Sequence, residues 1–175
     1  MSWLDQVGKF LKHQSSAGAA AAPAPDVNAV FDQVAKEAPP SVIAEGLAEA
    51  FRSKQGPGFS AMLTKLFSNS NPDQKTGMLN EFLSSMRPDV LTRVLTGAGV
   101  AGIVGKPGAK FTPEQAQTIA PETVRELATQ AEKANPAIVD SFSNFYARHA
   151  ALVKTLGPSI LTIALTKIAQ RQKAA

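Results

Sequence analysis

The sequence predicts an all-α protein, and three observations support this fold class. Apolar residues recur at intervals of three and four through most of the chain, which is the spacing of one helical face. Prolines repeatedly follow residues that can cap a helix, as in Asn71-Pro72 and Thr112-Pro113. No stretch alternates apolar and polar residues as a half-buried strand would. We therefore expect an irregular helical bundle or two small helical lobes, with a short N-terminal amphipathic helix on a flexible tether.

The first expected element is an amphipathic helix over residues 1–13. At helical spacing its apolar residues form a single stripe: Trp3, Leu4, Val7, Phe10 and Leu11. Lys9 and Lys12 lie on the other face. Residues 14–25 are rich in Ser, Ala, Gly and Pro, which bury too little apolar surface to offset the entropy of ordering. They are expected to form a flexible linker between this helix and the body.

Residues 26–96 are expected to form a helical lobe. Runs of apolar residues at helical spacing begin at Val27, Val42, Phe59, Met78 and Val90. Asn71 and Gln74 together indicate a capping box. Ser41, which follows two prolines, is expected to cap another helix.

Residues 97–110 contain five glycines and are expected to form a loop or hinge. A second lobe over residues 111–175 follows, with helix starts at Thr112 and at Asn135-Pro136. Further apolar runs begin at Val124, Ile138 and Ile160. The sequence leaves open whether the glycine-rich stretch separates two domains or is a long loop inside one bundle.

The net charge of +4 is unevenly distributed, because no Asp or Glu follows Ser141. We expect a basic surface near the C-terminus, formed by Arg148, Lys154, Lys167, Arg171 and Lys173. Charges interrupt the first apolar run, so it does not resemble a secretory signal. The most apolar stretch, residues 160–169, covers about half of the roughly 20 residues that a membrane-spanning helix needs. We expect a cytoplasmic protein, with peripheral attachment at the inner membrane as the further option.

The residue pattern favours no enzyme, metal site or cofactor. The chain has no cysteine, which excludes disulfides and thiolate ligands, and its two histidines lack partners at ligand spacing. Gly97-Ala98-Gly99-Val100-Ala101-Gly102 has the letters of a dinucleotide fingerprint, but no strand is expected before it. We find no nucleophile elbow and no pair of carboxylates in an apolar setting.

An aromatic cluster beside basic residues could stack the bases of single-stranded nucleic acid. The helical spacing instead places Phe142 and Phe145 on the core side of their helix, with Tyr146 and Arg148 exposed. Nucleic-acid binding therefore rests on charge alone and is a minor alternative.

We expect a non-catalytic scaffold or adaptor that docks through Trp3, Leu4, Val7, Phe10, Leu11, Lys9 and Lys12. Its partner would be an anionic membrane surface or a protein groove, because Trp and flanking lysines suit a bilayer interface. Oligomerisation, or the basic C-terminal helix, would strengthen such a short anchor. The helix could instead fold back on its own body. It could also dock on a neighbouring copy in a self-assembling homo-oligomer, and a hollow interior would make the chain a carrier of an apolar ligand.

Three segments carry a family resemblance. Trp3-Leu4-Asp5-Gln6-Val7 with Phe10-Leu11-Lys12 is the first, and Thr112-Pro113-Glu114-Gln115 and Asn135-Pro136-Ala137-Ile138-Val139-Asp140 are the others. Together they resemble the YidB-like family of uncharacterised bacterial proteins, over about a third of the chain. The resemblance implies a bacterial, all-helical, non-enzymatic protein, and it implies no particular activity.

Overall fold

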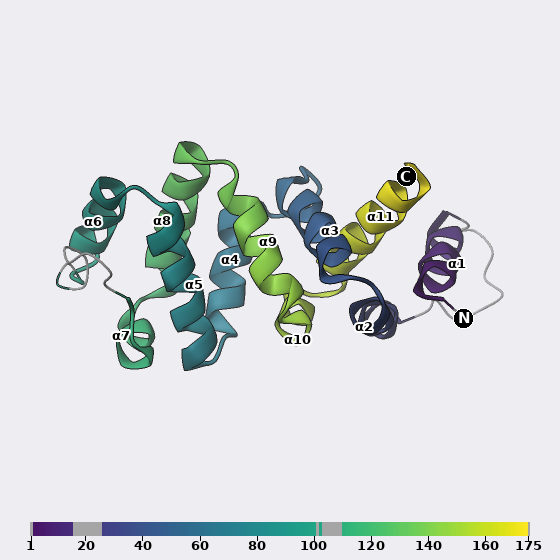
Figure 1. Ribbon diagram of the computed structural model, residues 1–175, viewed down its shortest axis with the longest axis horizontal. Coiled ribbons are helices and arrows are strands. Elements are labelled where there is room, and N and C mark those ends of the chain that lie inside the picture. The colour runs from purple at the N-terminus through teal and green to yellow at the C-terminus, as the bar shows by residue number, and fades with distance from the viewer. Residues whose placement is uncertain (1, 16–25, 101, 103–109, 175) are drawn as a thin grey trace. The chain divides into compact units, whose positions relative to one another are not determined.

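A computed structural model describes residues 2–15, 26–100, 102 and 110–174 of the chain (Figure 1). The described residues form helices α1 to α11 and a short 3-10 helix, η2, and they contain no strand. The predicted all-α fold class is therefore confirmed. The expected linker over residues 14–25 lies almost wholly outside the described residues, as does most of the glycine-rich stretch.

The chain divides into two compact units, and the division differs from the expected one. Unit 1 consists of Met1–Gly56 and Ser143–Ala175, and unit 2 consists of Pro57–Phe142. The expected lobes, residues 26–96 and 111–175, are split because the C-terminal helix packs against helices from the first third of the chain. Residues 97–110 connect two helices inside unit 2 and do not divide the chain.

Unit 1 contains α1 (Trp3–Ser15), α2 (Val27–Glu37), α3 (Pro40–Arg52), α10 (Ala150–Val153), η2 (Lys154–Leu156) and α11 (Pro158–Ala174). The yellow α11 packs against α3, α2 and the purple α1 (Figure 1). Gly46 lets α3 approach α11 closely, because a Cβ there would lie 2.3 Å from Cγ1 of Ile168. Any residue larger than glycine at position 46 would therefore force α11 or the Ile168 side chain to move.

Unit 2 contains α4 (Phe59–Ser68), α5 (Pro72–Ser85), α6 (Pro88–Gly97), α7 (Pro113–Thr118) and α8 (Pro121–Ala134). Helix α8 packs on α4 and α6, and α7 packs on α5. The ring of Phe142 lies 5.9 Å from that of Phe59 and 4.7 Å from that of Phe82. The amide of Phe111 donates to Oδ1 of Asn80 at 2.8 Å, which ties the start of α7 to α5.

Two of the expected caps are present as complete capping boxes. The side chain of Asn71 accepts from the amide of Gln74, and the Asn71 amide donates to the Gln74 side chain. Thr112 and Gln115 form the same reciprocal pair at the start of α7. These boxes satisfy amides that the first turn of a helix leaves without intrahelical partners.

Two other expected starts are displaced. Helix α3 begins at Pro40 with Pro39 as its cap residue, so Ser41 is inside the helix and the prediction that it caps was wrong. Proline suits the first helical position because its missing N–H has no intrahelical partner there. Helix α9 (Ile138–Ala147) begins after Asn135-Pro136, and the Asn135 side chain accepts from the amide of Ala137 at 3.3 Å.

Phe142 of α9 is buried as predicted, but the two other aromatic residues of this helix face differently from the prediction. Tyr146 is fully buried and its ring lies 6.5 Å from that of Phe51, whereas Phe145 is half-buried and stacks on His149 at 4.5 Å. Tyr146 follows Phe142 by four residues, so the two share one helical face, and Phe145 lies to the side of it. The prediction that Tyr146 is exposed was therefore wrong, whereas Arg148 is exposed as expected.

Candidate docking surfaces

Helix α1 is folded onto its own unit. Val7 and Phe10 are 1% and 3% exposed, and the helix packs against α2 and α11. The amide of Trp3 donates to Oε2 of Glu37 at 3.0 Å, while the other oxygen of that carboxylate accepts from Gln33. Two of the residues expected to dock externally are thus covered by the body of the same chain, and Trp3 is half-buried.

The outward flank of α1 joins an apolar strip to two lysines. Leu4 is 45% exposed and is the one exposed large hydrophobic side chain among the residues that the structure describes. Leu11, two turns further along the helix, is half-buried, and Lys9 and Lys12 are exposed. Leu4, Gly8 and the two lysines line, with Asp5, a shallow hollow of about 280 Å³. We call this surface the α1 flank.

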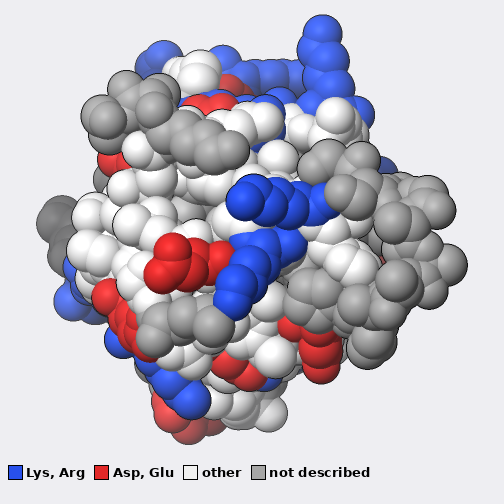
Figure 2. Space-filling view, turned by 90° about the vertical axis from the view of Figure 1, so that its right-hand side faces the viewer, with Lys and Arg blue, Asp and Glu red and all other residues white. Residues whose placement is uncertain are grey.

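Figure 2 views the molecule from the side on which α1 lies in Figure 1. Basic side chains cross the centre and the upper edge of this face, with acidic side chains beside them. The face is therefore mixed in charge. Within α1 itself, Asp5 is the one acidic residue beside Lys9 and Lys12.

The expected basic surface near the C-terminus is partly neutralised. Nζ of Lys154 lies 2.8 Å from Oδ2 of Asp32, and Nε of Arg171 lies 3.7 Å from Oε2 of Glu45. Lys167 is half-buried, and the side chain of Lys173 lies outside the described part of the chain. The C-terminal segment contains no acidic residue, but α2 and α3 supply acidic partners that a local count of charges misses.

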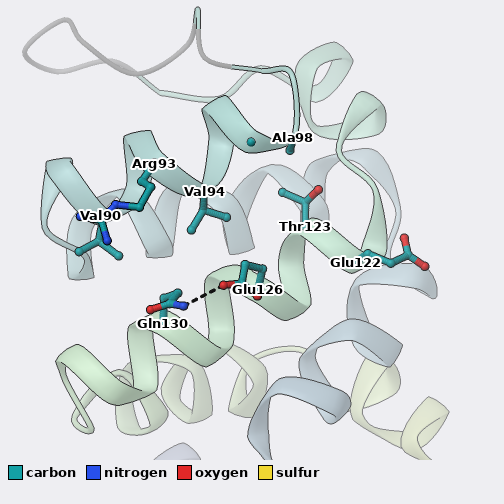
Figure 3. Close-up of a pocket in the computed structure, with 9 residues that line it drawn as sticks. Val90, Arg93, Val94, Ala98, Glu122, Thr123, Glu126 and Gln130 are labelled. Carbon is teal, nitrogen blue, oxygen red and sulfur yellow. Dashed lines mark hydrogen bonds between the residues drawn. The ribbon is translucent and has the colours of Figure 1, made fainter.

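A groove between α6 and α8 in unit 2 was not expected from the sequence. Its volume is about 390 Å³. Figure 3 shows Val90 and Val94 of α6 facing α8 across it, with Arg93 at one side. The α8 side carries Glu122, Thr123, Glu126 and Gln130, and the Gln130 amide donates to Glu126 at 2.8 Å. The lining could hold one or two apolar side chains beside a charged group, and it contains no nucleophile paired with a base.

The described residues contain no group of three or more His, Cys, Asp or Glu placed to hold a metal ion. Within the same residues, no single helix is long and apolar enough to cross a membrane. The segments 150–156 and 158–172 reach that length and composition only as a pair, and they are bent by 120° at the break between them.

No family model matches the chain, and no curated protein or solved structure was found to be similar to it. The resemblance to the YidB-like family therefore remains a prediction from the quoted motifs.

Proposed function

We propose that this chain is a non-catalytic docking protein that adsorbs to an anionic membrane surface through the α1 flank. The observation that carries the proposal is the position of Leu4. It is the exposed large apolar side chain of the described residues, and it shares its hollow with Lys9 and Lys12. Interfacial helices combine these same elements, an apolar strip for the acyl boundary and lysines for anionic headgroups.

While α1 stays packed on α2 and α11, the expected affinity of the chain for the membrane is low. A lysine near an anionic surface contributes about 1 kcal/mol. Full burial of an exposed leucine contributes about 1.5–3 kcal/mol, and Leu4 can gain about half of this because it is 45% exposed. The two lysines and Leu4 together supply about 3 kcal/mol, which corresponds to a dissociation constant on the order of 5 mM. Val7 and Phe10 add little net apolar contribution, because they are already buried and release of α1 from α2 and α11 would forfeit that burial. Adsorption of a single copy is therefore weak and reversible, and several copies binding together would strengthen it.

The proposal implies a peripheral location, and it favours the cytoplasmic leaflet because that leaflet carries the anionic lipids. On this proposal the helical body acts as a scaffold or adaptor that recruits a further component.

Co-sedimentation with vesicles tests the proposal. Lys9→Glu combined with Lys12→Glu should abolish pelleting with phosphatidylglycerol-containing vesicles. The control, Lys54→Glu combined with Lys133→Glu, changes two other exposed lysines and alters the net charge equally. The control variant should still pellet for the most part with the anionic vesicles. With vesicles of pure phosphatidylcholine, neither the unmodified chain nor the control variant should pellet.

Leu4→Gln separates the apolar contribution from the charge. Because Leu4 is exposed, the change leaves the core of unit 1 intact and should still reduce pelleting severalfold. Equal losses for the α1 pair and the control pair would show that net charge alone attracts the chain. No pelleting of the unmodified chain with anionic vesicles would rule out the proposal.

A further inference from the structure

We propose that the surface of α2 and α11 that holds α1 also accepts the α1 of a second copy, so that two chains exchange their N-terminal helices. This inference concerns the buried face of α1 and is independent of membrane binding by its outward flank. Exchange of an identical element between copies needs no contact beyond those already present in one chain.

The surface that receives α1 is held together without it. Gly46 of α3 packs directly on Ile168 of α11, and Glu45 pairs with Arg171 across the same two helices. Lys154 in η2 binds Asp32 of α2. These contacts connect α2, α3, η2 and α11, so the receiving surface remains formed when α1 leaves it.

The contacts that α1 makes with α2 and α11 do not depend on which chain supplies the helix. Val7 and Phe10 provide its fully buried apolar side chains, and Trp3 provides a backbone hydrogen bond to Glu37. All of these groups belong to α1 or to the receiving surface. A second copy therefore offers an equivalent helix.

The connection between α1 and α2 determines the balance between the two arrangements. Residues 16–26 contain no large apolar residue, and eleven extended residues span at most about 36–40 Å. A short connection of this kind gives an effective concentration on the order of millimolar for the chain's own helix. Exchange should therefore be a minor state at low concentration and should grow with protein concentration.

Thiol cross-linking between full-length chains tests exchange, because the chain has no cysteine of its own. One chain carries Ser2→Cys and the other carries Lys36→Cys, two exposed positions next to Trp3 and Glu37, whose hydrogen bond is left intact. The two are mixed and treated with a short bismaleimide in buffer without lipid. A chain with both substitutions reports docking within one copy. A mixture of the Ser2→Cys and Lys133→Cys chains reports random collision.

Exchange predicts that the first mixture forms cross-linked heterodimer above the level of the Lys133→Cys control. The yield should rise about tenfold with a tenfold rise in concentration while the dimer remains minor. Phe10→Asp in the Ser2→Cys chain should lower the yield of cross-linked heterodimer to the level of the Lys133→Cys control. The inference is overturned if the doubly substituted chain cross-links internally while the mixture does not exceed its control. Absence of cross-linking in both would overturn it as well, because α1 would not occupy this surface. Vesicle binding can succeed or fail with either result, so the two proposals are tested separately.

Discussion

The contact between α3 and α11 at Gly46 gives a quantitative prediction for Gly46→Ala. The added methyl group would lie 2.3 Å from Cγ1 and 2.8 Å from Cδ1 of Ile168, and 3.1 Å from the carbonyl oxygen of Ala164. Carbon atoms pack at about 3.5–4.0 Å, so the first two contacts require movement. Ile168 is itself buried, and the Ala164 oxygen belongs to the backbone of α11, so neither can move freely.

Two opposing effects determine the size of the change. Alanine is favoured over glycine inside a helix by about 1 kcal/mol, whereas overpacking a filled core costs about 1–3 kcal/mol. Since backbone as well as side chain blocks the new methyl group, we expect Gly46→Ala to lower the free energy of unfolding of unit 1 by about 1–2 kcal/mol. Gly8→Ala is the matched control. It adds a methyl group to a helix with nothing within 4 Å and should be neutral or stabilising.

Native-state hydrogen exchange of α3 and α11 amides measures this change within unit 1. A double-mutant cycle with Ile168→Ala tests the contact itself. Ile168→Ala alone should cost about 2–5 kcal/mol, and the double variant should be more stable than the sum of the two single changes predicts. Additive effects, or a Gly46→Ala chain as stable as the unmodified one, would refute a close approach of the two helices at this position.

Three further predictions follow from local geometry. Asn71→Ala should destabilise unit 2 by about 1 kcal/mol in urea unfolding, whereas Ser41→Ala should change stability by less than about 0.5 kcal/mol because that residue caps nothing. Burial raises the pKa of the Tyr146 hydroxyl well above its ordinary value. The resulting stability is fully present below about pH 10 and is lost as the pH rises toward the folded pKa, so Tyr146→Phe should flatten the alkaline fall in the urea midpoint. Lys154→Met should cost no more than about 1 kcal/mol, because both partners of its ion pair with Asp32 are partly exposed; a larger loss would show a role beyond the pair.

Local features of the fold could be predicted because they depend on neighbouring residues. The capping boxes at Asn71 and Thr112 involve residues three positions apart, and the apolar runs give the positions of the longer helices. The short α10 and η2 were missed, since four and three residues are too few to show a period.

Long-range packing could not be predicted in the same way. The return of α11 to α2 and α3 places the unit boundaries after Gly56 and inside α9. The five glycines of residues 97–110 indicated a break, but this stretch lies within unit 2. Its composition is that of a loop, and composition does not reveal which helices meet in space.

The candidate site shows the same limit. Helical spacing identified the apolar stripe of α1, but it could not show that α2 and α11 cover Val7 and Phe10 and leave Leu4 exposed. The α6–α8 groove gave no signal at all, because its lining residues come from two helices separated by the glycine-rich stretch.

The central claim is that α1 meets the membrane, and the single tryptophan of the chain reports on this helix directly. We would titrate the full chain with phosphatidylglycerol vesicles whose acyl chains carry bromine, and follow quenching of Trp3 fluorescence. Docking through α1 predicts saturable quenching that is reversed by salt and absent with neutral brominated vesicles, because lysine attraction to the surface is screened. Fluorescence that does not change while the protein pellets with the same anionic vesicles would show that another surface of the chain binds them.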